Sequence, residues 1–299
     1  MGGEPSETRV ERARRRGDET VTSSPSMVER LRVAAVQMSS QDDVSANLTR
    51  AAELVARAAD AGAALVLLPE NFAYLGPEEG KRAVAEPVGD GAQGPILAAV
   101  SEAARRARVY VIAGGMPERA ADPARPYNTC VVVSPDGKTM GKYRKVHLFD
   151  VDVGDGQRYC ESASTTPGDA PVTVTVAGFS VGLSVCYDLR FPELYRKLSH
   201  AGADLFVVPA AFTLATGKDH WHVLLRARAI EAQAYVVAAA QWGTHPRGRR
   251  TYGKSLIVDP WGDVIAQCPE GEGVTVADVE RGYIERVRAN LPALRHRRL

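Results

Sequence analysis

The spacing of apolar residues divides most of the chain into short strand-like runs and longer helical stretches. Apolar runs rich in β-branched residues predict strands, and apolar side chains three and four positions apart predict helices. The first half is expected to contain strand 31–38, helix 47–61, strand 64–69, helix 95–106 and strand 109–114. The second half follows with strand 179–185, a helix from 192, strand 203–209, helix 220–234 and strand 235–241. Strands that alternate with helices predict parallel pairing with the helices packed outside.

Two turn signals add antiparallel hairpins at the edges of this parallel core. Residues 135–138 separate strands 127–134 and 139–143, and residues 260–263 separate strands 255–259 and 264–268. Between these hairpins, residues 150–169 form a polar, glycine-containing loop, and long loops of this kind are usually functional or disordered. We therefore expect one mixed α/β domain over residues 30–299.

The two ends of the chain differ from this pattern. Residues 1–29 are polar, mixed in charge and without aromatic residues, which predicts a disordered leader, with Met27 as a possible true start. Residues 281–299 hold six arginines and one glutamate, so they are poorly suited to fold on themselves. Together with the apolar and aromatic strip at 191–195, this tail predicts a homodimer or higher even oligomer, the alternative being a solvated basic tail.

Composition narrows the class of protein. The 299 residues are 45% hydrophobic, which suffices for a sizeable core, and the net charge of +1 offers no general field for nucleic acid or an anionic membrane. No run is long and apolar enough for a membrane-spanning helix. Four widely separated cysteines show no disulfide framework, so we expect a cytoplasmic protein in which all but Cys186 act as packing residues.

Reactive side chains follow the predicted strands, where loops of open α/β sheets build their sites. Glu70 follows one strand, Lys145 another, and Cys186 lies where a strand turns sharply into a helix. If they converge, Glu70 can accept the thiol proton, Cys186 can attack an amide carbon, and Lys145 can stabilise the oxyanion. The alternatives are a small buried cysteine, a solvent carboxylate at a helix start, and a charge on an edge strand.

Three sequence motifs, one after another along the chain, resemble those of a known protein family. They are Leu-Pro-Glu-Asn at 68–71, Tyr-Arg-Lys-Val-His-Leu-Phe-Asp at 143–150 and Cys-Tyr-Asp-Leu-Arg-Phe-Pro-Glu at 186–193. With them, residues 31–299 resemble the nitrilase superfamily of carbon–nitrogen hydrolases. The resemblance implies a four-layer α-β-β-α sandwich and a catalytic triad of Glu70, Lys145 and Cys186. It also implies that Glu161 helps to position substrate and lysine.

Within that superfamily the chain is most similar to the Nit branch, which includes deaminated glutathione amidase and ω-amidase. The resemblance implies a cysteine-dependent amidase acting on a small carboxylate-bearing amide, first of all deaminated glutathione. Alternatives are 2-oxoglutaramate, a nitrile, an N-carbamoyl compound, or a non-catalytic metabolite-binding or scaffold protein. Two departures, His222 and the Gly-Asp-Gly run at 154–156, leave the shape of the leaving-group pocket open.

We expect the acyl part of such a substrate to need a fixed cation, and Arg190 lies four residues after the nucleophile. The alternative is that Arg190 pairs with Asp188 or Glu193 and braces the turn. The other expected substrate-binding residues are Tyr187, Phe212, Thr213 and Thr216. No cofactor is implied, and no metal site is expected because His220 and His222 diverge on a helix.

Overall fold

Two six-stranded sheets form the centre of the molecule. The computed structural model describes residue 2 and residues 28–89, 92–152, 154 and 158–298, so most of the expected leader 1–29 and most of the 154–156 departure lie outside the described residues. The first sheet has the order β18 (Gly273–Glu280), β1 (Arg30–Gln37), β2 (Leu65–Leu68), β5 (Tyr110–Glu118), β6 (Tyr127–Val133) and β7 (Thr139–Arg144). The second has the order β10 (Thr173–Val176), β11 (Phe179–Leu183), β12 (Leu205–Ala210), β13 (Tyr235–Ala240), β16 (Leu256–Val258) and β17 (Val264–Gln267).

Each sheet has the expected parallel centre and antiparallel edges. In the first sheet β1, β2 and β5 are parallel, and in the second sheet β11, β12 and β13 are parallel. Three small two-stranded sheets lie outside them: β3 (Val88–Gly89) with β4 (Ala92–Gln93), β8 (Asp150–Asp152) with β9 (Arg158–Cys160), and β14 (Trp242–Thr244) with β15 (Arg250–Tyr252).

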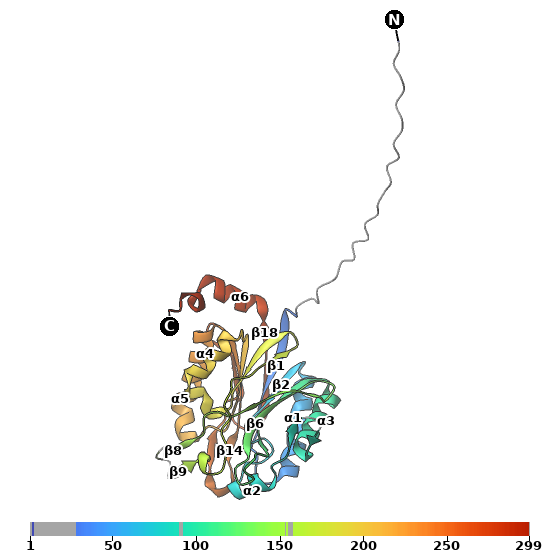
Figure 1. Cartoon of the computed structure of the whole chain (residues 1–299), viewed down its shortest axis with the longest axis vertical. Helices are drawn as coiled ribbons and strands as arrows, with labels where there is room; N and C mark the ends of the chain where they lie inside the picture. The colour runs from blue at the N-terminus through green and yellow to red at the C-terminus, as the bar shows by residue number, and fades with distance from the viewer. Residues whose placement is uncertain (1, 3–27, 90–91, 153, 155–157, 299) are drawn as a thin grey trace.

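Helices cover the outer face of each sheet and complete four layers. Figure 1 shows α1 (Val44–Asp60) and α3 (Pro95–Ala107) on one side of the molecule and α4 (Pro192–His200) and α5 (Leu214–Ala232) on the other. The sheets contact each other directly, β1 with β13 and β5 with β12. The α-β-β-α sandwich predicted from the resemblance is therefore confirmed. The two remaining α-helices are α2 (Glu78–Ala83) and α6 (Arg281–Asn290).

The strand residues explain why both faces of a sheet are buried. In β1, Val33 and Ala35 belong to the core between the sheets, whereas Ala34 and Val36 belong to the core beneath α1 and α3. Successive side chains of a strand point to opposite faces, so a continuous apolar run suits a strand that is covered twice. Gly114 allows a close approach of the two sheets, because a Cβ there would lie 1.9 Å from the Cβ of Pro209.

One helix start and the expectation for the tail were wrong. The helix expected at 220–234 is α5, which begins at Leu214 because the side chain of Thr213 accepts a hydrogen bond from the Thr216 N–H and caps it. Part of the tail does fold on its own chain, since 281–290 form α6, in which Ile284 and Val287 are buried.

The strip at 191–195 also differs from the expectation. Leu194 is 5% exposed and Tyr195 is 2% exposed, so these two side chains pack inside the subunit instead of offering a surface to a partner. Within the described ranges, none of the helices is long and apolar enough to cross a bilayer.

Candidate active site

Cys186 lies at a sharp turn after β11. It opens a short 3₁₀ segment, Cys186–Arg190, which precedes α4. Its φ of 50° is in the left-handed region, which side chains other than glycine seldom adopt, so the turn is a locally strained one. The expected strand-to-helix turn is confirmed, and Cys186 lies beyond the carboxyl end of β11 and is 7% exposed.

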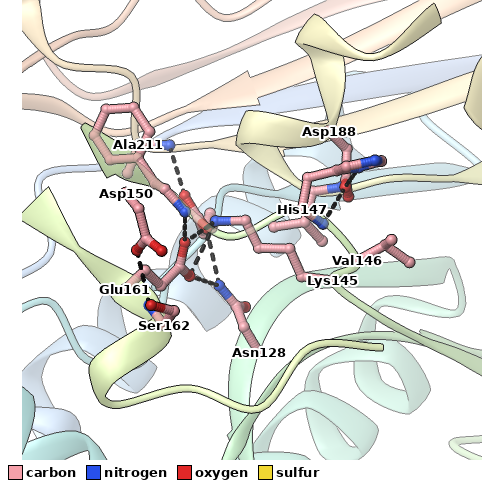
Figure 2. Close-up of polar contacts among 12 residues, drawn as sticks. Asn128, Lys145, Val146, His147, Asp150, Glu161, Ser162, Asp188 and Ala211 are labelled. Atoms are coloured by element: carbon pink, nitrogen blue, oxygen red, sulfur yellow. Dashed lines mark hydrogen bonds and ion pairs between the residues drawn. The ribbon is translucent and has the colours of Figure 1, made fainter. Parts of the chain in front are cut away.

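Lys145, which follows β7 of the first sheet, joins two carboxylates. Its Nζ donates to Glu70 Oε1 at 3.0 Å and to the two Glu161 oxygens at 3.0 and 2.7 Å. Figure 2 shows the lysine side chain extending toward Glu161 and Asn128. The side chains of Lys145 and Glu70 are 2% and 3% exposed, so neither is a solvent-facing charge.

The carboxylate of Glu70 is held from three directions. Besides the Lys145 ammonium, Asn128 Nδ2 donates to Oε1 at 2.9 Å and the Ala211 N–H donates to Oε2 at 3.1 Å. Asn128 Nδ2 also reaches Glu161 Oε1 at 3.3 Å, so one amide group bridges both acids. Gly115 makes room for them, because a Cβ there would lie 2.6 Å from Asn128 Oδ1 and 2.7 Å from Glu70 Cγ.

Burial and neighbouring charges set the protonation states. Burial raises the pKa of the Cys186 thiol well above its usual value, and the Glu70 carboxylate raises it further, against a smaller lowering by Lys145. Burial lowers the pKa of Lys145, but Glu161 and Glu70 outweigh it and raise the pKa overall. Burial raises the pKa of Glu161, and the attraction of Lys145 outweighs it and brings that pKa to about 2. The resting site therefore pairs a neutral thiol with a charged lysine, and the thiol needs a base before it can attack.

Asp188 braces the turn that carries the sulfur. Its carboxylate accepts from Tyr143 Oη at 2.7 Å, from the Val185 N–H at 2.8 Å and from the His147 N–H at 3.0 Å. The Nδ1 of His147 lies 2.7 Å from the same carboxylate, as Figure 2 shows. Because His147 is two residues after Lys145, this buried acid fixes the lysine segment against the nucleophile segment.

A cavity of about 170 Å³ opens over these groups. Its wall includes every residue expected from the sequence to be catalytic or to bind substrate: Glu70, Lys145, Glu161, Cys186, Tyr187, Arg190, Phe212, Thr213 and Thr216. Residues of the wall that the sequence did not suggest are Asn71, Glu78, Lys81, Phe149, Arg158, Tyr159, Cys160, Ala211 and Arg249. Cys160 corrects the expectation of a packing residue, since it is exposed.

Arg190 has no carboxylate partner among the described residues. Its Nη1 lies 3.2 Å from His220 Nδ1, and its guanidinium lies 5.2 Å from the centre of the Phe212 ring. The ion pairs with Asp188 or Glu193 that formed the alternative are thus not seen in this part of the chain. His222, one of the departures, contacts Gln267 at 2.7 Å and is not in the described cavity wall.

Comparison with known sequences agrees with the geometry. Residues 32–289 match the family described as carbon-nitrogen hydrolase. The chain is 45% identical over 267 residues to a deaminated glutathione amidase of Synechocystis sp., and this alignment covers 88% of this chain and 97% of the relative. It is 43% identical over 273 residues to the human deaminated glutathione amidase, covering 89% of this chain and 82% of the relative.

Solved structures show the same fold. Saccharomyces cerevisiae Nit3, described as a member of branch 10 of the nitrilase superfamily, is 31% identical with a TM-score of 0.81, over 91% of this chain and 98% of that chain. The Caenorhabditis elegans NitFhit protein is 37% identical with a TM-score of 0.83, over 90% of this chain and 65% of that longer chain.

Proposed function

Because the chain belongs to the carbon–nitrogen hydrolase family, we propose that it is a cysteine-dependent amidase that hydrolyses deaminated glutathione to 2-oxoglutarate and Cys-Gly. The observation that carries the proposal is the convergence of Glu70, Lys145, Glu161 and Cys186 at one cavity. The relatives that are 42–45% identical and named deaminated glutathione amidase support the choice of substrate.

Acylation uses Glu70 as the base and Cys186 as the nucleophile. Glu70 takes the thiol proton as sulfur bonds to the amide carbon, and the carbonyl electron pair moves onto oxygen. The Lys145 ammonium faces that oxyanion, while Glu161 and Asn128 hold the lysine and the base in place. The carbonyl then re-forms, the C–N bond breaks, and the proton on Glu70 passes to the leaving nitrogen.

Deacylation repeats these steps with water. Water attacks the thioester while Glu70 accepts one of its protons, and the proton passes to the sulfur as the C–S bond breaks. The two half-reactions together consume one amide and one water and return Cys186 as a thiol. This is why a raised thiol pKa suits the site, because the sulfur is charged only while Glu70 holds its proton.

Arg190 is proposed to bind the carboxylate of the 2-oxo-acid half. It lies on the same short segment as Cys186, lines the cavity and lacks a described acidic partner. Replacing it in Arg190→Gln should lower kcat/KM for carboxylate-bearing amides by roughly 30- to 1,000-fold, the cost of an unpaired buried charge, with little loss for a neutral amide of similar size. Equal losses on both substrates would assign Arg190 to bracing the turn.

An activity panel tests the substrate assignment. Deaminated glutathione, 2-oxoglutaramate, a nitrile and a carbamoyl amino acid are compared by kcat/KM with the purified chain. We expect deaminated glutathione to be the best substrate and 2-oxoglutaramate, which shares its acyl half, to be the second. A preference for the nitrile or the carbamoyl compound would reject the assignment, and absence of any turnover would favour a binding or scaffold protein.

We also propose a homodimer or higher even oligomer, with an interface that differs from the one expected at 191–195. Val223 and Ile230 on α5 are 66% and 47% exposed, and Trp261 is 56% exposed. The tail after α6 stays a candidate for the same role. All four cysteines are free, which supports a cytoplasmic setting in which Cys186 keeps its thiol.

A further inference from the structure

Arg249 is a second half-buried cation in the wall of the active-site cavity. It directly precedes β15, and its Nη2 donates to the Ala211 carbonyl at 3.0 Å. Its Nε is buried without a hydrogen-bond partner in the described structure. No carboxylate of the described chain lies within ion-pair distance of it. A guanidinium has five N–H donors, and the contact to the Ala211 carbonyl uses one of those on Nη2. Arg249 therefore keeps its charge and the other donors of its two Nη groups for a ligand in the cavity whose wall it forms.

The other cations of the wall are engaged differently. Lys145 is paired with Glu70 and Glu161, and Lys81 donates to Glu78 at 2.9 Å. Arg158 belongs to β9 and is exposed. Arg190 and Arg249 are therefore the half-buried arginines of this wall that lack a described acidic partner, and a ligand with two anionic groups would satisfy both.

The backbone of Ala211 connects Arg249 to Glu70, the proposed general base, so both lie on the same side of the cavity. The Ala211 carbonyl accepts from Arg249, and the Ala211 N–H donates to Glu70 Oε2 at 3.1 Å. In the proposed reaction Glu70 delivers the proton to the departing nitrogen, so the leaving group lies on the Glu70 side of the scissile bond. Arg190, in contrast, belongs to the segment that carries the nucleophile.

We propose that Arg249 binds the carboxylate at the far end of the leaving group, an inference that rests on the proposed amidase function. Deaminated glutathione carries one carboxylate on the acyl half and one on the glycine of the dipeptide that leaves. Arg190 would bind the carboxylate of the acyl half, and Arg249 would bind that of the glycine. The substrate class is then amides of a 2-oxo diacid whose amine portion ends in a carboxylate, and 2-oxoglutaramate, which releases only ammonia, has nothing for Arg249 to bind.

The test compares substrates that differ only on the leaving side. Arg249→Met keeps an unbranched side chain and removes the charge. We expect kcat/KM for deaminated glutathione to fall about 10- to 100-fold, mainly through KM. The values for its neutral C-terminal amide and for 2-oxoglutaramate should change less than about threefold. Arg249→Lys should recover part of the loss, because it restores a positive charge.

Two controls separate binding from a structural role. Arg250→Met removes the adjacent, exposed arginine and should leave all three substrates unaffected. Both natural amides give the same 2-oxoglutaryl enzyme, so its hydrolysis rate, measured after rapid mixing, should be unchanged by Arg249→Met.

Each other outcome has a definite meaning. An equal loss on the three substrates, or slower hydrolysis of the acyl enzyme, would overturn the inference and assign Arg249 to holding Ala211 and Glu70. If the unmodified chain hydrolyses 2-oxoglutaramate, and has the same kcat/KM for deaminated glutathione and for its C-terminal amide, the amidase function stands and this inference fails. If it hydrolyses none of the amides, the proposed function itself fails.

Discussion

Replacing Lys145 with methionine removes the positive charge of a buried three-charge cluster. The cluster contains Glu70, Glu161 and the ammonium, which makes three hydrogen bonds of 2.7–3.0 Å to the two acids. Its net charge changes from −1 to −2 in a site where the lysine side chain is 2% exposed. Methionine fills a similar volume, so the perturbation is mainly electrostatic.

Two effects of different size should follow. The oxyanion loses its cation, which typically costs ~10²–10³ in rate. The two acids lose their partner, and removal of one member of a buried ion pair typically costs about 3–5 kcal/mol of stability. Because the attraction of Lys145 is the largest influence that lowers the pKa of Glu161 to about 2 against its burial, removal of Lys145 should raise that pKa.

The double variant Lys145→Met/Glu161→Gln separates these effects. It returns the cluster charge to −1, so most of the lost unfolding free energy should be regained in denaturant titrations. Acylation of Cys186 by deaminated glutathione, followed under single-turnover conditions, should stay as slow as in the single variant. Lys145→Arg should not rescue turnover, because a planar guanidinium cannot occupy the place of a compact ammonium.

Near-normal acylation by Lys145→Met or Lys145→Arg would refute the assignment of the oxyanion contact. A single variant as stable as the unmodified chain would contradict the buried charge cluster instead. Recovery of turnover in the double variant would mean that the lysine acts only by neutralising Glu161.

Three further predictions concern the nucleophile, a buried histidine and the oligomer. Cys186→Ala should abolish turnover with an unchanged fold by circular dichroism, and Cys186→Ser should be nearly inactive because Glu70 is too weak a base for a hydroxyl; turnover by either would exclude the covalent mechanism. Burial lowers the pKa of His245 from 6.5 to about 4. Between these two pH values the unfolded chain binds a proton at this residue and the folded chain does not. The unfolding free energy is therefore highest above pH 6.5 and falls as the pH is lowered. Between about pH 7.5 and about pH 5 the unmodified chain should lose about 2 kcal/mol more unfolding free energy than His245→Gln, and equal losses would contradict the buried neutral imidazole. Sedimentation should give a dimer or larger even oligomer at micromolar concentration and a smaller species for Ile230→Glu, whereas a monomeric unmodified chain would reject the oligomer.

Local patterns in the sequence are enough to predict the parallel strands and the three reactive residues at strand ends. Glu70 and Cys186 each follow an apolar run and Lys145 follows the mostly polar β7, and loops at strand ends tend to build a shared site, so the pattern makes all three candidates. Their convergence at one cavity is what the structure adds. The layered sandwich, in contrast, follows from the resemblance, because strand order alone does not say that two sheets pack face to face.

Long-range contacts account for what the sequence did not reveal. Asn128 is an ordinary strand residue in the sequence, and only the sheet order, in which β5 alone separates β6 from β2, brings its amide to Glu70 and Glu161. Arg249 stands in a run with several arginines, and only the path of the chain after β14 turns it, and not Arg250, into the cavity. The start of α5 was misplaced because residues 214–219, the first turns of this helix, contain Gly217 and have weak helical periodicity in the sequence.

Intact-mass measurement of the chain during turnover tests the central claim most directly. Deaminated glutathione is mixed with the enzyme, the reaction is stopped with acid within the first turnover, and the protein is weighed and digested. We expect a mass increase equal to one 2-oxoglutaryl group, located on Cys186 and absent from Cys186→Ala. Rapid release of Cys-Gly with no acyl group on Cys186, or with the group on another residue, would contradict it.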